Sequence, residues 1–220
     1  MKDSKDFYEG IGLTLLDPQN ETEGVREYQK LEEEFIKRTF EGVDSVLEVG
    51  CGEGRYLRHL APLVGKITGI DFAEQLVNLA KESTATFDNV NVILGRAEHL
   101  PTLVQETFTY ALLGWNTIGN IPQEVHEIIF DNLEKLVEEK IFISTLKCGP
   151  EVMDERLRFY AKTGLKVESI NGNQVILEGG SHCPNAYPFS YFQELLESIG
   201  FSMETHDLGW VGVMIEGSKK

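Results

Sequence analysis

Three glycines at alternate positions, Gly50, Gly52 and Gly54, follow the apolar-rich run 46–49 and constrain the fold more than any other feature. A helical pattern of apolar residues begins directly after them, at Leu57. Because glycine accepts positive φ and has no Cβ, this order predicts a strand, a tight turn and a helix start. A helix start offers unpaired N–H groups and a partial positive charge, so we expect a ligand with anionic or hydroxyl-rich parts at this turn.

The spacing of these glycines is G-x-G-x-G, whereas dinucleotide sites use G-x-G-x-x-G, and Arg55 stands where their third glycine would be. With Glu48 two residues before Gly50, the run resembles the first motif of class I methyltransferases, which use S-adenosylmethionine. The resemblance implies that Glu48 braces the turn. It also places a set of residues beside the methionine half of the cofactor: Gly50, Cys51, Gly52, Gly54 and Arg55.

A carboxylate ends the second predicted strand. Asp71 follows the run 66–70, and Phe72 comes next. Such a carboxylate can accept hydrogen bonds from both ribose hydroxyls, so we expect Asp71 and Phe72 in the cofactor site. The alternative for Asp71 is a cap on the helix that starts near Ala73, and the two roles are compatible.

The segment 92–101 is similar to the family's G-D-A-x-x-L-P segment, which contacts adenine. Arg96 occupies the position of the usual aspartate. The acceptor for the adenine amino group is then either Glu98 or a backbone carbonyl, while the N–H of Ala97 is expected to serve the ring.

The expected fold class is α/β. Strands are predicted at 44–49, 66–70, 90–94, 108–113 and 140–146, and helices at 54–64, 73–86 and 122–137. This alternation specifies a parallel sheet with helices on both faces and a ligand at the carboxyl ends of the strands. A helix at 190–200 and strands at 201–206 and 210–215 resemble the end of the methyltransferase fold. We therefore expect a Rossmann-like, doubly wound, seven-stranded sheet, mostly parallel with one antiparallel strand.

One domain is expected, with an N-terminal helical arm (1–42), a cofactor-binding core (43–149), a lid insert (150–188) and a C-terminal part (189–220). The arm holds turn formers in 1–20, read as irregular structure or a short helix, and an amphipathic helix at 23–40. Residues 27–30 look like a segment of glycine N-methyltransferase-like enzymes that carries an arginine to the cofactor carboxylate. Arg26 is the matching candidate, with a surface role as the alternative, and Tyr8 is expected to cover the site.

Two further segments bear on the identity of the methyl acceptor. Gly114, Trp115 and Asn116 follow the fourth strand, where methyltransferases of exocyclic amines carry Asn/Asp-Pro-Pro-aromatic, so that substrate class is disfavoured. The same run is similar to one in glycine N-methyltransferase-like enzymes, which makes Asn116 a candidate for holding the acceptor or the methionine end. In the insert, which contains a predicted helix (151–163) and hairpin (165–177), His182 and Tyr187 are the candidate catalytic residues.

Composition narrows the partners. The chain has 36 acidic and 20 basic residues, a net charge of −16, which opposes a nucleic-acid partner. The three cysteines are widely separated and the five histidines have no metal spacing, so we expect a cytoplasmic protein without a metal site. No apolar run reaches membrane-spanning length, and we expect no membrane partner. The oligomeric state is not indicated.

The leading hypothesis is an S-adenosylmethionine-dependent methyltransferase that acts on nitrogen or oxygen of a small molecule. Methylation of a protein or RNA is one alternative, which the charge and the missing Asn-Pro-Pro run disfavour. A non-catalytic module that only binds the cofactor is another. A nicotinamide-dependent dehydrogenase is disfavoured by the glycine spacing.

Overall fold

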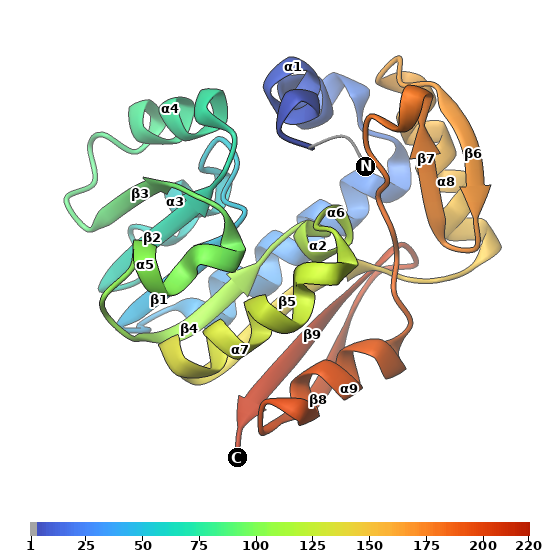
Figure 1. Ribbon diagram of the computed structural model, residues 1–220. Helices are drawn as coiled ribbons and strands as arrows, with labels where there is room; N and C mark the ends of the chain where they lie inside the picture. The colour runs from blue at the N-terminus through green and yellow to red at the C-terminus, as the bar shows by residue number, and fades with distance from the viewer. Residues whose placement is uncertain (1–3) are drawn as a thin grey trace.

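A seven-stranded sheet, in the order β3-β2-β1-β4-β5-β9-β8, runs through the computed structural model, which describes residues 4–220 (Figure 1). Its strands are β1 (Ser45–Val49), β2 (Lys66–Asp71), β3 (Val90–Leu94), β4 (Phe108–Leu113), β5 (Val137–Leu146), β8 (Phe201–Leu208) and β9 (Gly212–Lys219). Strands β1 to β5 pair in parallel, and β9 is antiparallel to both β5 and β8. The predicted sheet with one antiparallel strand is confirmed.

Helices connect the strands and cover both faces of the sheet. The α-helices are α1 (Ser4–Leu16), α2 (Glu23–Phe40), α3 (Arg55–Leu60), α4 (Glu74–Ser83), α5 (Leu100–Leu103), α6 (Thr117–Asn120), α7 (His126–Leu136), α8 (Pro150–Lys162) and α9 (Phe189–Ser198). Short 3₁₀ turns are η1 (Pro18–Asn20), η2 (Ala97–His99), η3 (Gln123–Val125) and η4 (Glu178–Gly180). Within the described residues, no helix has the length and apolar character needed to cross a membrane.

Two hydrophobic cores lie on opposite faces of the sheet because neighbouring strand residues point to opposite sides. Leu47 packs in the core with α7 and α9, while its neighbour Val46 packs in the core with α2, α3 and α4. The same division separates Ile143 from Phe142 in β5. Strands buried on both faces explain the near-continuous apolar runs of the sequence.

The insert forms a small unit of its own beside the sheet. It contains α8 and a two-stranded hairpin, β6 (Val167–Asn171) with β7 (Gln174–Leu177), as the sequence predicts. A third core joins it to the arm; its buried members are Phe7, Val25, Phe159, Tyr160, Val175 and Leu177. In Figure 1, α1 lies between α4 and the insert, so the arm spans the gap between them.

Several predicted boundaries change. The helix predicted at 122–137 is divided into η3 and α7, and β5 begins at Val137, three residues before the predicted start. The backbone of Val137 is already extended, with φ −107° and ψ 127°, as suits a β-branched residue. Arm residues 4–16 form a helix, which is one of the two predicted alternatives for this segment. Residues 1–3 of the predicted arm lie outside the described residues.

Candidate active site

A cavity of about 490 Å³ opens at the carboxyl ends of the parallel strands, where the sequence places its ligand. We name its two ends by the elements that form them. The sheet end is lined from the loops after β1 to β4, with Glu48, Gly50, Cys51, Gly52, Arg55, Asp71, Phe72, Arg96, Ala97, Glu98, Gly114, Trp115 and Asn116. The insert end is lined from α1, α8 and the insert, with Phe7, Tyr8, Arg156, Phe159, Tyr160, Leu177, His182 and Pro184.

The three motif glycines serve different purposes, although each has positive φ. A Cβ on Gly50 would lie 2.6 Å from Cγ2 of Thr117, and one on Gly54 would lie 3.2 Å from Cα of Ala80. Gly54 therefore permits close packing of α3 on α4 and does not line the cavity, contrary to its predicted place beside the cofactor. A Cβ on Gly52, at φ +54°, would meet no atom within 4 Å, so Gly52 leaves space at the cavity wall.

Asp71 braces the glycine turn. Its Oδ2 accepts a hydrogen bond of 2.9 Å from the N–H of Gly52, and its Oδ1 accepts one of 2.9 Å from the N–H of Ala73, which precedes α4. The carboxylate is 7% exposed. Burial raises the pKa of Asp71, and the backbone hydrogen bonds oppose that rise. The predicted helix cap is wrong, because the N-cap of α4 is Ala73, which has no side-chain cap hydrogen bond, and at the start of that helix Asp71 bonds only the N–H of Ala73. The Asp71 side chain also lines the cavity.

Glu48 brings a second, less compensated carboxyl group to the sheet end. It is 2% exposed, and its Oε2 has no hydrogen-bond partner among the residues whose side chains the structure describes. Burial raises the pKa of Glu48 well above its ordinary value, with the charge of Arg55 opposing the rise. A buried oxygen without a partner carries a desolvation cost, so a donor arriving from the cavity would relieve it.

Arg55 is the arginine that the arm holds at the cavity. Its Nη1 donates to Oε1 of Gln29 over 2.8 Å, and its Nη2 lies 3.6 Å from Oε2 of Glu32. Both partners belong to α2, whose buried face carries Tyr28 and the acid Glu32. The Oε1 of Glu32 also accepts the N–H of Trp115 over 2.6 Å. The arm therefore reaches the site through Gln29 and Glu32.

The prediction for Arg26 is wrong. Its side chain is 63% exposed and its Nε lies 3.5 Å from Oε2 of Glu21, away from the cavity. The reason is helical register: Val25 is buried and lines the cavity, and the next residue is rotated by about 100° toward solvent.

The segment that follows β3 carries an ion pair close to Phe72, formed by Arg96 and Glu98. Nε of Arg96 lies 2.8 Å from Oε1 of Glu98, and the guanidinium stands 5.5 Å from the centroid of the Phe72 ring. The Tyr8 ring contacts Phe72 edge-on at 5.8 Å between centroids. The positive charge of Arg96, at the position of the usual aspartate, is therefore balanced by Glu98. The carboxylate of Glu98 also lines the cavity.

The loop after β4 is strained and tightly bonded. Trp115 and Asn116 have positive φ, 41° and 57°, which side-chain-bearing residues seldom adopt. Oδ1 of Asn116 accepts from the hydroxyl of Thr145 at 2.9 Å and the N–H of Leu146 at 3.3 Å, and its Nδ2 donates to the carbonyl of Asn185 at 3.3 Å. Asn116 thus ties β4, β5 and the insert together at the cavity wall.

His182 occupies the insert end. Its ring stacks on Phe7 with centroids 4.6 Å apart, and its Nε2 lies 3.3 Å from the hydroxyl of Tyr8 and 3.2 Å from Oδ1 of Asn120. Burial lowers the pKa of His182 to about 4, so the imidazole is neutral at pH 7. It can accept a proton or a hydrogen bond there, but it is a weak base.

Tyr187 does not join His182. Its ring stacks on Tyr191 with centroids 4.4 Å apart and contacts His126, and it does not line the cavity. The prediction fails because 182–188 is an extended segment that leaves the insert and runs to α9, which carries Tyr187 to the α7 side.

Sequence reasoning missed Glu32, Asn120 and Arg156. A signal exists for two of them. Glu32 follows Tyr28 by four residues, and Arg156 precedes Tyr160 by four, so both charged residues lie on the apolar face of an amphipathic helix. Asn120 has no comparable local signal, because only the fold brings it to His182.

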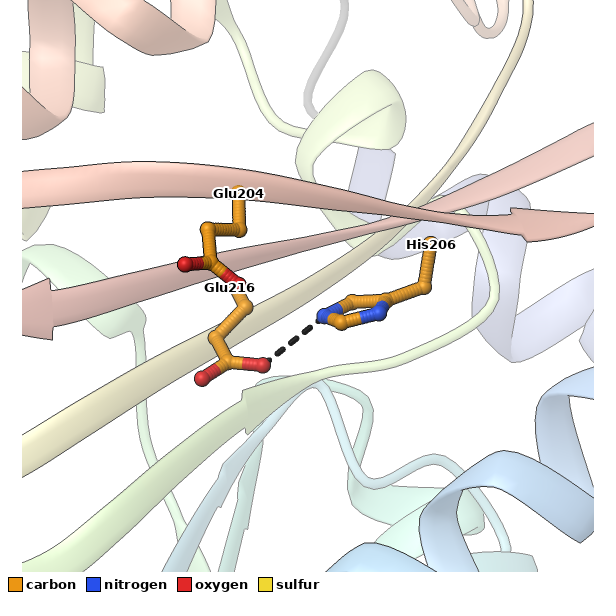
Figure 2. A group of neighbouring side chains, drawn as sticks. All are labelled: Glu204, His206 and Glu216. Atoms are coloured by element: carbon orange, nitrogen blue, oxygen red, sulfur yellow. Dashed lines mark hydrogen bonds and ion pairs between the residues drawn. The ribbon is translucent and has the colours of Figure 1, made fainter.

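A separate group of side chains lies at the far edge of the sheet. Glu204, His206 and Glu216 come within 4.8 Å of one another through the atoms that could hold a metal ion (Figure 2). Nε2 of His206 lies 2.8 Å from Glu216, and Nζ of Lys140 lies 2.5 Å from the other oxygen of Glu216. Burial alone would raise the pKa of Glu216, but these hydrogen bonds hold it below its ordinary value. We interpret the group as an ion-pair network.

This strand order, with the cavity above a glycine turn and an acid ending β2, defines the fold of the class I S-adenosylmethionine-dependent methyltransferases. Residues 46–140 match the family described as "Methyltransferase domain". The match to this family covers that segment of the chain.

A curated relative matches part of the chain. The chain is 37% identical over 79 residues to demethylmenaquinone methyltransferase of Staphylococcus aureus (strain JH9), which covers 34% of this chain and 32% of that protein. The chain thus matches about a third of the length of the curated relatives.

Two solved structures have the same fold over nearly the whole chain. Magnesium protoporphyrin IX methyltransferase from Synechocystis PCC 6803, with bound SAH, has a TM-score of 0.67 at 13% identity, covering 98% of each chain. The 1,6-didemethyltoxoflavin-N1-methyltransferase of Burkholderia thailandensis has a TM-score of 0.68 at 12% identity, covering 99% of this chain and 87% of that chain.

Proposed function

We propose that this protein is an S-adenosylmethionine-dependent methyltransferase that transfers a methyl group to nitrogen or oxygen of a small molecule. The observation that carries the proposal is the sheet end of the cavity, where Gly52 leaves open space and the carboxyl groups of Glu48 and Asp71 line the same cavity. The cysteine pattern supports a reducing cytoplasmic location as part of the same proposal.

The residues present fit this cofactor. Glu48 has a buried oxygen without a partner, which suits the ammonium group of the methionine tail. The space beside Gly52 allows a ligand to approach the backbone closely. Asp71 retains acceptor capacity for ribose hydroxyls, since a carboxylate has about four acceptor sites and Asp71 accepts backbone hydrogen bonds from Gly52, Phe72 and Ala73. Arg55 directly follows the glycine turn in sequence and is already held by Gln29 and Glu32. Its guanidinium is the candidate partner for the carboxylate of the methionine tail.

Bound S-adenosylmethionine supplies a methyl group activated by its positive sulfur. The chain's own contribution is to orient the acceptor and exclude water, which can lower the barrier by about 7–11 kcal/mol in well-aligned systems. The arm and the insert exclude water by covering the cavity with Phe7, Tyr8 and Phe159. His182 and Asn120 offer polar atoms that hold the acceptor through a hydrogen bond. The low pKa of His182 favours this positioning role over that of a strong base.

Calorimetry with S-adenosylmethionine and S-adenosylhomocysteine tests the proposal first. We expect both to bind the purified protein with one site per chain. A screen of small-molecule acceptors with methyl-labelled donor then measures transfer, and product inhibition by S-adenosylhomocysteine is expected. Binding of both ligands without labelled product from any acceptor, including protein and RNA, would favour a non-catalytic module, and failure of both to bind would refute the proposal.

A further inference from the structure

Arg156 is a buried cation at the insert end of the cavity. It is 4% exposed and projects from α8, in the insert. Its Nη1 donates to the carbonyl of Asn173 over 2.6 Å, and its Nη2 donates to the carbonyl of Pro184 over 2.9 Å. Among the residues whose side chains are described, its Nε has no hydrogen-bond partner. The guanidinium is thus held in place by neutral groups, and Nε is left without a partner.

The two other arginines that line the cavity have carboxylate partners. Arg55 lies beside Glu32 and Arg96 beside Glu98, at 3.6 Å and 2.8 Å. Within residues 7–220, whose side chains are described, Arg156 forms no such ion pair; the distances at its site are to carbonyl oxygens. A buried charge normally requires a charged partner, because neutral dipoles repay only part of its lost hydration.

The titratable groups around Arg156 do not provide that partner. Burial raises the pKa of Tyr160, one helical turn along α8, while the charge of Arg156 and its hydrogen bond to Tyr160 oppose that rise. Burial also raises the pKa of the Cys148 thiol, so both groups are neutral at pH 7. His182 is neutral as well. The neighbouring Glu155 is turned to other partners, since its Oε1 accepts the N–H of Gly24 at 2.7 Å and its Oε2 lies 2.7 Å from Nη2 of Arg158.

The rest of the insert end is apolar and aromatic. Phe7, Phe159, Tyr160 and Leu177 belong to one hydrophobic core and also line the cavity. Trp115 extends this wall toward the sheet end and contacts Phe159 edge-on at 6.3 Å between centroids. Such a wall suits a flat apolar body, and one cation within it suits a single anionic group.

We propose that Arg156 recognises a carboxylate on the methyl acceptor, and that the acceptor is an aromatic or similarly apolar small molecule bearing that carboxylate. This inference rests on the proposed function and names the substrate class of its acceptor site. The Nε–H of Arg156 would supply the hydrogen bond to the carboxylate, while Nη1 and Nη2 keep the guanidinium fixed.

The test uses pairs of probes with the same ring and similar shape, in which a carboxylate is replaced by a neutral amide: 2-naphthoate with 2-naphthamide, and indole-3-acetate with indole-3-acetamide. Their affinities are measured by calorimetry on the full chain saturated with S-adenosylhomocysteine. We expect the parent to bind each carboxylate at least tenfold more tightly than its amide, and Arg156→Gln to reduce this ratio to about one. Arg158→Gln is the matched control, because Arg158 is 60% exposed on the same helix, and it should keep the parent's ratio.

An equal affinity of the parent for carboxylate and amide, or an undiminished ratio in Arg156→Gln, would overturn the proposal. Arg156 also joins α8 to the hairpin, so circular dichroism must show that the variant is folded. If it is not, Arg156→Lys takes its place, with a reduction of the ratio of at least threefold expected and an unchanged ratio contradicting us. The affinity for S-adenosylhomocysteine, measured on the same samples, reports separately on the cofactor site.

Discussion

The sheet end and the insert end of the cavity differ in what forms them. At the sheet end, the loops that follow successive parallel strands provide the site: Gly50 and Gly52 form the turn after β1, and the carboxylate of Asp71, at the end of β2, holds the backbone of that turn. At the insert end, side chains distant in sequence meet: Tyr8 and Asn120 both contact His182. A site built from a backbone turn is fixed by local spacing, whereas a site built from side chains of an arm and an insert is free to vary with the acceptor.

Glu32 connects the arm to the sheet end, and its removal should have the largest effect. Glu32→Ala leaves the Arg55 cation and the N–H of Trp115 without their buried partner. We expect the free energy of unfolding to fall by about 3 kcal/mol, as is typical when one member of a buried pair is lost. Urea denaturation measures it. Glu34→Ala, an exposed acid on the same helix, should change stability by less than about 0.5 kcal/mol; similar losses in both variants would contradict the connecting role of Glu32.

Gly52→Ala tests the sheet end alone. The added Cβ enters the space beside the turn, so affinity for S-adenosylhomocysteine should fall about a hundredfold, or ~2.7 kcal/mol. Gly42→Ala is a close control, since Gly42 also has positive φ (+80°) and a Cβ there would meet no atom within 4 Å, but it does not line the cavity. The control should keep the parent's affinity, and equal losses in the two variants would mean that backbone strain, rather than the ligand space, is responsible.

The insert end predicts a pH dependence of stability through His182. Its pKa is about 4 in the folded chain, against an ordinary value of 6.5. Between these values the unfolded chain binds the extra proton, so the stabilising contribution is complete above about pH 6.5 and is lost as pH falls toward about 4. Between pH 7 and pH 4.5 the parent should lose about 2.5 kcal/mol more stability than His182→Asn, which lacks the titrating group. Parallel losses in urea denaturation would show that His182 titrates normally.

Tyr8→Phe gives the smallest expected effect. It removes the hydroxyl 3.3 Å from Nε2 of His182 and keeps the ring that contacts Phe72. One neutral hydrogen bond contributes about 0.5–1.5 kcal/mol, so turnover with a given acceptor should fall about threefold. Affinity for S-adenosylhomocysteine should not change. A loss of cofactor affinity instead of turnover would assign the Tyr8 hydroxyl to the sheet end.

The sequence predicted the sheet end of the cavity better than the insert end. The order of strands and helices, the glycine turn, Asp71 and the segment at Ala97 were predictable because they depend on periodicity and short spacings. Arg26 was wrongly placed in the cofactor site because it lies one residue after Val25, the helix position that faces the cavity. Similarity over a short segment does not determine which helix position faces a site. Tyr187 was misplaced because an extended segment carries it away from the insert. Asn120 was missed because long-range packing alone brings it to His182.

The central claim is that the sheet end holds the adenosyl cofactor with Asp71 as a main contact. Isothermal titration of S-adenosylhomocysteine into the parent and into Asp71→Ala tests it most directly, with Asp88→Ala, an exposed acid, as the control. We predict binding to the parent and to the control, and a loss of at least thirtyfold, or about 2 kcal/mol, in a folded Asp71→Ala variant. Equal affinity of all three proteins for this ligand would contradict the account.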